Sequence, residues 1–412
     1  MNKILLIIGN VWPEPCTTAA GHRMLQLIHA FKDFGYHITF GSTASESEFS
    51  FDLDKLGITS VTLQLNHSSF DEFVQVLHPD VVIFDRFMVE EQFSWRVAEF
   101  APQALRILNT EDLHSLRKTR EESHKKGEEF TLGAWRKHPM TLREVASIYK
   151  SDLTLMISSY EMEILQKELA IPEDLLVHLP FMLAKLTSKE ITAWPNFEER
   201  EDFISFGNGK HAPNLDSILC LKESIWPLIR EKLPHVNLKI YGAYLPKHIQ
   251  QLHNPEEGFH VLGWAEHLDE EIQKACICLA PLRFGAGIKG KLMDAMKNGT
   301  PSVTTSIGVE GMHGDLPWNG TVTNDWTSFA KAAVELYGNQ EKWKQAQGNG
   351  VNTINKLYNR ELLPDKLIQK LQETQKNLEN HRNKNVVGRM LQQQTVASTK
   401  YMARWIEEKN RK

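Results

Sequence analysis

The chain has 412 residues, of which 41% are hydrophobic and 24% charged, and its formal net charge is −5. This length exceeds what one hydrophobic core usually supports and suits two domains of roughly 150–200 residues each. The net charge gives no indication of nucleic-acid binding. No apolar run reaches the ~18 residues that a membrane-spanning helix requires.

The start of the chain and its cysteines both indicate a reducing compartment. The opening run MNKILLIIGN is short, stops at Gly9 and has no small-residue cleavage site, so it does not read as a secretory signal. Cys276 and Cys278 alternate within an apolar run, which is typical of buried free thiols, and no further ligands with metal-site spacing lie near them. We therefore expect a cytoplasmic protein that binds no metal.

The first half of the chain alternates short apolar runs with longer amphipathic segments. A helix is predicted at 21–35, where Gly35 suits a helix C-terminus. Strands separated by helices favour a parallel sheet that is covered on both faces. The strands predicted in this half are 3–9, 37–42, 60–65, 80–85, 103–112, 152–159 and 175–181.

The second half restarts this alternation after a linker at 182–200. A long helix is predicted at 212–233, and the strands are predicted at 202–209, 237–243, 259–266, 276–284, 301–308 and 321–325. We therefore predict an α/β protein with two Rossmann-like domains that face a central cleft. Its three predicted parts are a first domain (1–182), a second domain (201–360) and C-terminal helices with a basic tail (361–412).

The end of the tail, TKYMARWIEEKNRK, has the pattern of a short amphipathic helix. Two interpretations stay open. The segment is a frayed or disordered surface tail, or it binds a membrane surface or a partner.

A glycine-rich loop in the second half carries the strongest chemical signal. PLRFGAGIKGKLMDAMKNG contains G-x-G-x-x-G at Gly285, Gly287 and Gly290, between an apolar run and a predicted helix. A dinucleotide-binding loop, however, follows the first strand of its domain and is followed by an acid at the end of the next strand. Here the loop comes late and the next strand ends in two threonines, so a nicotinamide or flavin oxidoreductase is only the alternative.

The charges around this loop favour a different ligand. Arg283, Lys289 and Lys291 concentrate positive charge beside a helix N-terminus, which attracts anions. Lys291 and Asp294 are three residues apart, on one helix face. A lysine for phosphate and an acid for sugar hydroxyls suit a nucleoside diphosphate that carries a sugar. An exposed glycine turn with solvated lysines is the simpler interpretation.

Several segments together resemble bacterial glycosyltransferases of the GT-B fold, specifically the retaining group called family four or group 1. The resemblance covers most of the chain except the tail. The segments that carry it are 13–39, 108–121, 144–165, 206–218 and 281–312.

The resemblance implies roles for the glycine-rich loop. Asp294 takes the place of the family's glutamate that holds the nucleotide ribose. The glutamate that usually contacts the donor sugar is replaced by Ala286. The backbone amides of Ala286, Gly287 and Ile288 are expected to face the diphosphate.

Other donor contacts also follow from the resemblance. Asn208 stands where the family usually has an arginine, so the phosphate charge is expected to be met by Lys291, Arg283 or Lys210. Glu310 lies in a glycine-flanked loop and is a candidate for binding the donor sugar or base.

In the first domain, Gly21, His22 and Arg23 begin a predicted helix that could meet donor phosphates or an acidic acceptor, or simply start a helix. Asp112 and His114 are the catalytic candidates, because they follow a predicted strand at the sheet edge where α/β proteins bind ligands. Arg117 would lie beside them. In the simpler interpretation, Asp112 only caps the following helix and His114 is an ordinary surface histidine.

These features predict a hexosyltransferase-type glycosyltransferase that moves a sugar from a nucleoside-diphosphate-sugar to a glycan, lipid-linked or other acceptor. The resemblance further implies retention, no metal or cofactor, and a role in cell-surface polysaccharide or glycoconjugate synthesis, in the cytoplasm or at the inner face of the membrane. A catalytically inert nucleotide-sugar-binding protein is a second alternative, because Ala286 and Asn208 replace charged residues of the family.

Overall fold

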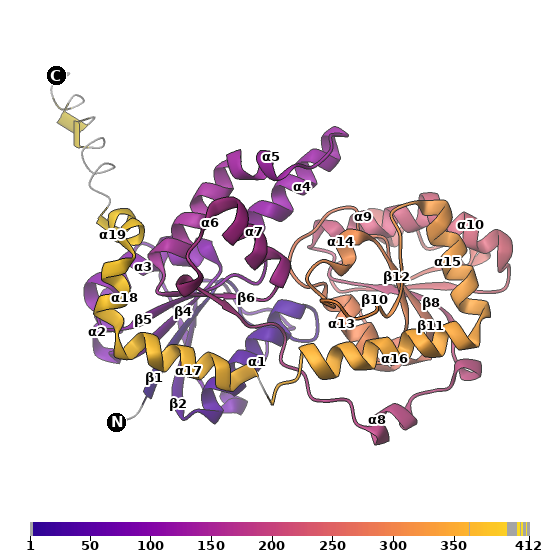
Figure 1. Ribbon diagram of the computed structural model, residues 1–412, viewed down its shortest axis with the longest axis horizontal. Helices are drawn as coiled ribbons and strands as arrows, with labels where there is room; N and C mark the ends of the chain where they lie inside the picture. The colour runs from indigo at the N-terminus through magenta and orange to yellow at the C-terminus, as the bar shows by residue number, and fades with distance from the viewer. Residues whose placement is uncertain (1–2, 362, 394–401, 404, 407–408, 410–412) are drawn as a thin grey trace.

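The computed structural model describes residues 3–361, 363–393, 402–403, 405–406 and 409. It contains two α/β domains that lie next to each other, with C-terminal helices that return from the second domain to the first (Figure 1). This arrangement confirms the predicted fold class.

The first domain is built on a seven-stranded parallel sheet of order β3-β2-β1-β4-β5-β6-β7. The order reverses direction at β1, which pairs with both β2 and β4. Its strands are β1 (Lys3–Gly9), β2 (Tyr36–Ser42), β3 (Thr59–Thr62), β4 (Val81–Asp85), β5 (Leu105–Asn109), β6 (Leu153–Met156) and β7 (Leu176–His178).

The second domain has a six-stranded parallel sheet of order β10-β9-β8-β11-β12-β13. Its order reverses at β8, which pairs with β9 and β11. Its strands are β8 (Glu201–Phe206), β9 (Leu238–Tyr241), β10 (Phe259–Gly263), β11 (Ala275–Ala280), β12 (Ser302–Thr304) and β13 (Gly320–Val322).

Helices cover both sheets. Those of the first domain are α1 (Ala19–Asp33), α2 (Ser69–Leu77), α3 (Phe87–Phe100), α4 (His114–Lys126), α5 (Leu132–Lys137), α6 (Pro139–Lys150) and α7 (Ser159–Leu169). The connection between the domains holds α8 (Ser188–Ala193). Those of the second domain are α9 (Ala212–Cys220), α10 (Trp226–Lys232), α11 (Lys247–Gln250), α12 (Leu268–Lys274), α13 (Gly290–Lys297), α14 (Ser306–Val309), α15 (Trp326–Gly338) and α16 (Gln340–Leu357).

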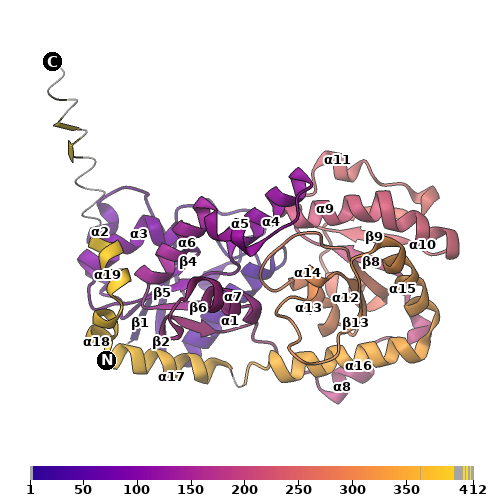
Figure 2. The same cartoon turned by 45° about the horizontal axis from the view of Figure 1, so that its top comes forward.

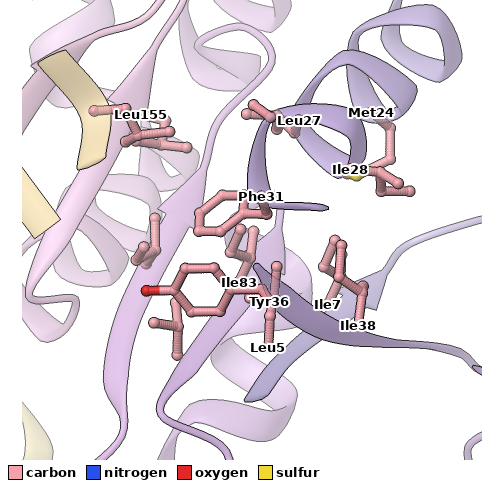
Figure 3. Close-up of a cluster of buried hydrophobic side chains, with 14 of the residues drawn as sticks. Leu5, Ile7, Met24, Leu27, Ile28, Phe31, Tyr36, Ile38, Ile83 and Leu155 are labelled. Atoms are coloured by element: carbon pink, nitrogen blue, oxygen red, sulfur yellow. The ribbon is translucent and has the colours of Figure 1, made fainter. Parts of the chain in front are cut away.

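Helix α1 shows how the sequence sets these elements. The Thr18 hydroxyl accepts a hydrogen bond from the backbone amide of Gly21 and so caps the start of the helix. Gly35 adopts a left-handed conformation just after the end of the helix. The apolar face of α1 packs on β1 and β2, where the rings of Phe31 and Tyr36 meet edge to face at 5.1 Å (Figure 3). Such burial is the main stabilising contribution to this layer.

The predicted helix at 212–233 is divided in the structure. A π-helical turn, η4 (Leu221–Ile225), separates α9 from α10. Pro227 lies at the start of α10 and has no amide hydrogen to donate, so the regular α-helical ladder cannot continue through it.

The C-terminal helices correct the predicted domain division. Helix α16 runs along the second domain, and α17 (Leu363–Lys376) continues along the first (Figure 2). Leu367 and Leu371 of α17 are buried in the first domain's core. The helices α18 (Leu378–Lys384) and α19 (Val386–Gln393) follow, and Arg382 pairs with Asp152 of the first domain at 2.7 Å. Residues 363–393 therefore belong to the first domain rather than to a separate region.

The predicted amphipathic segment of the tail lies mostly outside the described residues. In the described ranges, no helix has both the length and the apolar character needed to cross a membrane.

We predict that Leu371→Ala lowers the free energy of unfolding by about 2–5 kcal/mol, because it leaves a cavity in the first domain's core. Urea denaturation followed by circular dichroism measures this loss. The control is Leu391→Ala on α19, whose side chain is partly exposed. Equal, small losses in both variants would contradict the packing of α17 into that core.

Candidate functional site

A cavity of about 870 Å³ lies between the two domains. It is lined by residues that follow the carboxyl ends of strands in both sheets, where open α/β sheets bind ligands. The lining comes from residues within 11–24, 85–86, 111–117, 157 and 181–183 of the first domain and its end, and from residues within 206–214, 241–243, 264–272 and 282–297 of the second.

Helix α13 brings two predicted donor residues to this cavity. It begins directly after the glycine-rich loop, without a side-chain cap, and Lys291 and Asp294 line the cavity in its first turns. Burial lowers the pKa of Lys291 to about 8. Burial raises the pKa of Asp294 to about 7, although nearby Lys297 opposes this shift. Among the described residues, neither side chain has a hydrogen bond or an ion-pair partner, so both are available to a ligand.

Two glycines of the loop allow the two domains to come into close contact. A Cβ atom on Gly290 would lie 2.4 Å from Cβ of Ala19 in α1. A Cβ atom on Gly287, which has a φ of 65°, would lie 2.8 Å from Cβ of Asp112. Larger residues would push the domains apart. The sequence assigned these glycines to phosphate approach, whereas here they allow contact between the domains.

The amide of Gly287 is already engaged. It donates to Oε1 of Glu161 at 2.7 Å, and the amide of Leu113 donates to the same oxygen at 3.2 Å. Burial raises the pKa of Glu161 to about 8, and the nearby Asp112 adds to this shift. Gly287 is thus not available to a diphosphate in this conformation, in contrast to the prediction.

The rest of the loop remains at the cavity. Gly285, Ala286 and Ile288 all line it. Ala286 also packs against an apolar cluster of the first domain. Lys289, whose pKa is lowered by burial, donates to the carbonyl of Gly287 at 2.8 Å and so stabilises the loop.

Glu310 does not reach the cavity. Its carboxylate accepts two hydrogen bonds from Arg120 of α4, at 2.7 and 2.8 Å, and Arg120 also donates to the carbonyl of Gly285 at 2.8 Å. The predicted contact of Glu310 with the donor sugar or base is therefore wrong for this conformation. The pair instead joins the two domains.

Arg283 is also placed differently from the prediction. It forms a two-pronged ion pair with Asp216, at 2.9 and 2.6 Å, and does not line the cavity. Asn208 and Lys210 do line it. The Lys210 ammonium lies over the ring of Tyr244, 3.5 Å from its centroid. Of the cations predicted for phosphate, Lys291 and Lys210 therefore reach the cavity.

The three polar residues at the start of α4 come together as predicted. His114 Nε2 lies 3.0 Å from Asp112 Oδ1, and Arg117 Nε donates to Asp112 Oδ2 at 2.7 Å. Burial alone would raise the pKa of Asp112, but Arg117 and His114 outweigh it and hold this pKa well below its usual value. All three residues line the cavity. The ionised Asp112 thus fixes the orientation of His114.

The start of α1 fits the prediction only in part. Gly21 and His22 line the cavity. Burial lowers the pKa of His22 and favours its neutral form. Arg23 is fully buried and donates to Asn109 Oδ1 at 3.0 Å and to the carbonyl of Leu179 at 2.7 Å. It holds the sheet edge together and does not meet a phosphate or an acceptor.

The cavity lining also includes polar residues that were not among the candidates, Asp85, Arg86, Glu111 and His211 among them. Burial lowers the pKa of His211 to about 4, with Arg117 contributing, so this ring is neutral near pH 7. The signal for Asp85 and Arg86 was present in the sequence, because both lie at the carboxyl end of the predicted strand at 80–85.

Comparisons with known proteins agree with this architecture. Residues 200–339 match the family described as "Glycosyl transferases group 1". The fold is similar to that of sucrose-phosphate synthase from Thermosynechococcus elongatus, with a TM-score of 0.67, 13% identity, and coverage of 90% of this chain and 98% of that one. It is also similar to Anabaena Alr3699/HepE in complex with UDP and glucose, with a TM-score of 0.65, 14% identity, and coverage of 90% and 100%.

A curated relative adds a sequence match. It is named "Uncharacterized 44.6 kDa protein in cps region" of Klebsiella pneumoniae, and it is 25% identical over 214 residues, which are 50% of this chain and 53% of that protein. The chain therefore spans about half the length of the curated relative it matches. Together these findings show the GT-B fold that the sequence resemblance predicted, and they show that the second domain is similar to the group 1 glycosyltransferase family over residues 200–339.

We predict that Glu161→Gln flattens the dependence of stability on pH. Because burial raises the pKa of Glu161 in the folded state, the folded protein keeps a proton that the unfolded chain releases between its ordinary value of 4.5 and about 8. Stability therefore falls as pH rises through this window. Above pH 8 the variant, which cannot ionise, should exceed the wild type by at least about 1 kcal/mol.

Urea denaturation at pH 6, 7, 8 and 9 measures this effect. Glu163→Gln on the same helix is the matched control, because its side chain is 54% exposed. A Glu161→Gln profile that runs parallel to the wild type would contradict the argument.

Proposed function

We propose that this protein is a glycosyltransferase that moves a sugar from a nucleoside-diphosphate-sugar to a glycan, lipid-linked or other acceptor. The observation that carries the proposal is a pair of largely buried charged residues on α13 that line the cavity. Lys291 and Asp294 face the cavity between the domains without partners among the described residues. They do so inside the domain that matches the group 1 family.

Lys291 and the start of α13 suit the diphosphate. The leaving diphosphate gains negative charge during transfer, and fixed positive groups stabilise that charge. The ammonium of Lys291 lies at a helix N-terminus, where backbone dipoles add to its effect. Asp294, one turn further on, would accept hydrogen bonds from the ribose hydroxyls.

The first domain would supply the catalytic group. His114 would orient the acceptor hydroxyl or the donor sugar, and Asp112 would fix its ring. Arg117 balances the charge of Asp112 at 2.7 Å. His114 is therefore the proposed catalytic residue, with Asp112 as its positioning partner.

The finer parts of the proposal rest on the sequence resemblance. They are transfer of a hexosyl group, retention of configuration, and activity without a metal or cofactor. Alr3699/HepE, which has been solved with UDP and glucose, supports a nucleotide-sugar donor. The Klebsiella relative from a cps region supports a role in surface polysaccharide synthesis.

Two alternatives remain to be separated from this function. A nicotinamide or flavin oxidoreductase would bind NADH or FAD in place of a nucleoside diphosphate. An inert protein of the same fold would bind the nucleotide-sugar without consuming it, because Ala286 replaces the family's sugar-binding glutamate. A donor screen by mass spectrometry, with release of the nucleoside diphosphate as the readout, distinguishes turnover from binding alone.

We predict that UDP or GDP raises the melting temperature whereas NADH does not, and that Lys291→Ala raises the Kd for the bound nucleotide at least tenfold. Isothermal titration calorimetry measures the Kd. Lys291→Arg keeps the charge above pH 8, where the lysine loses its proton, and should retain affinity there better than the wild type.

Arg283→Ala is the matched control, because this side chain is paired with Asp216 outside the cavity. Its nucleotide affinity should equal that of the wild type. Wild-type affinity in folded Lys291→Ala protein would refute the assigned donor site, and stabilisation by NADH alone would favour the oxidoreductase.

Contact with the inner face of the membrane is a further part of the proposal. Helix α19 exposes Val386, Val387 and Met390 beside Arg389, a combination of apolar and basic side chains that suits an anionic lipid surface. Co-sedimentation with vesicles that contain phosphatidylglycerol should bring down the wild type, and Met390→Glu should reduce the bound fraction severalfold. Equal binding of both proteins would count against this contact.

A further inference from the structure

The first-domain side of the cavity contains two charged residues in unusual backbone conformations. Arg86 follows β4 with a φ of 80° and a ψ of 157°, and Glu111 follows the neighbouring β5 with a φ of 60°. Residues with a side chain rarely adopt a positive φ, and those that do so are often found at functional sites. The two loops are tied together, because the amide of Arg86 donates to the carbonyl of Asn109 at 2.8 Å.

The guanidinium of Arg86 forms no ion pair among the described residues, although the nearby Glu111 interacts with it electrostatically. It lines the cavity, and its Nε is buried without a hydrogen-bond partner. Within the described ranges, no carboxylate pairs with it. A buried donor without a partner is costly. The Nε atoms of Arg23, Arg106 and Arg120 are in the same state, but of these four arginines only Arg86 lines the cavity, where an anionic ligand would give it a partner.

The acids close to Arg86 are engaged elsewhere. Asn109 Nδ2 donates to Asp85 at 3.2 Å and to Glu111 at 2.7 Å. Glu111 also lies 3.7 Å from the buried Arg23. Burial raises the pKa of Glu111, and Arg23 opposes this shift. His211, which faces this region from the second domain, is neutral near pH 7 and does not compete for an anion.

Helix α3 begins directly after Arg86. Arg86 is its N-cap residue, the helix is 14 residues long, and no side chain caps its start. The residues of α3 itself do not line the cavity, so the arginine fork is the group that can bind an oxyanion there. The site lies on the first-domain side of the cavity, whereas Lys291 belongs to the second domain.

We propose that Arg86 is a specificity-determining residue that binds an anionic group of the acceptor, either a phosphate or a carboxylate. The assignment of this anion to the acceptor rests on the proposed function, in which the second domain holds the donor. A phosphate would come from a lipid-linked diphosphate acceptor, and a carboxylate from an acidic sugar. Arg86 thus restricts the reaction to negatively charged acceptors.

Calorimetric titration with two simple anions tests this proposal. The probes are decyl diphosphate and methyl β-glucuronide, and the neutral counterparts are decyl β-glucoside and methyl β-glucoside. Titrations are made with the wild type, Arg86→Gln and Lys291→Ala, each in saturating UDP or GDP and again without nucleotide. We expect one anion to bind the wild type in saturating nucleotide, and its Kd to rise at least tenfold in Arg86→Gln, by a larger factor than in Lys291→Ala.

The choice between the two anions identifies the source of the charge. Binding of neither anion, unchanged affinity in Arg86→Gln, or a loss confined to Lys291→Ala would overturn the proposal. If no nucleoside diphosphate binds but the Arg86 effect persists without nucleotide, the proposed function fails while the anion site stands.

A backbone variant separates binding from folding. Arg86→Gly removes the guanidinium and also removes the backbone strain of a positive φ, so this variant should melt at a higher temperature than Arg86→Gln. Both variants should lose the same amount of affinity for the anion. Ala170→Gly, at a φ of 50° on the end of α7, is the matched control and should leave anion affinity unchanged. If Arg86→Gly bound the anion as the wild type does, Arg86 would have only a structural role.

Discussion

The unpaired charge of Lys291 is the constraint on which the arrangement of the cleft depends. An ammonium group surrounded by protein is costly unless a counter-charge is present, and its lowered pKa reflects this cost. The described part of the chain provides no such counter-charge for Lys291. By contrast, each of three arginines near the cleft forms an ion pair with an acid: Arg283, Arg117 and Arg120. An anionic ligand in the cavity would supply the missing partner, and this links the electrostatics of α13 to the proposed reaction.

The contact between the domains limits how that ligand can be held. Gly287 and Gly290 bring the loop against the first domain, and Glu161 and Arg120 hold it there through hydrogen bonds to Gly287 and Gly285. Contacts with the first domain thus help to determine the conformation of the loop. Opening of the cleft would release the Gly287 amide and the Glu161 carboxylate together. Such coupling would connect ligand entry to Glu161, the buried acid whose raised pKa predicts a fall in stability at high pH.

Much of the fold could be predicted from the sequence, because alternating apolar runs and helix periods are local signals. The cavity position also followed, since strand ends of parallel sheets point to one edge. The failures concern partners that are distant in the chain. Spacing alone could not reveal that Arg23 is buried against Asn109, that Glu310 pairs with Arg120, or that Arg283 pairs with Asp216. Arg86 could have been found from its place at the end of a predicted strand, whereas its positive φ is not encoded in any local pattern.

The structure of the protein with the bound nucleoside diphosphate tests the central claim most directly. Crystals grown with UDP or GDP, whichever binds, would locate the diphosphate by its electron density. The account predicts a phosphate oxygen within hydrogen-bonding distance of Lys291 Nζ, with ribose hydroxyls at the Asp294 carboxylate. A nucleotide bound outside the cavity, or one in the cavity whose phosphates leave Lys291 without a contact, would contradict it.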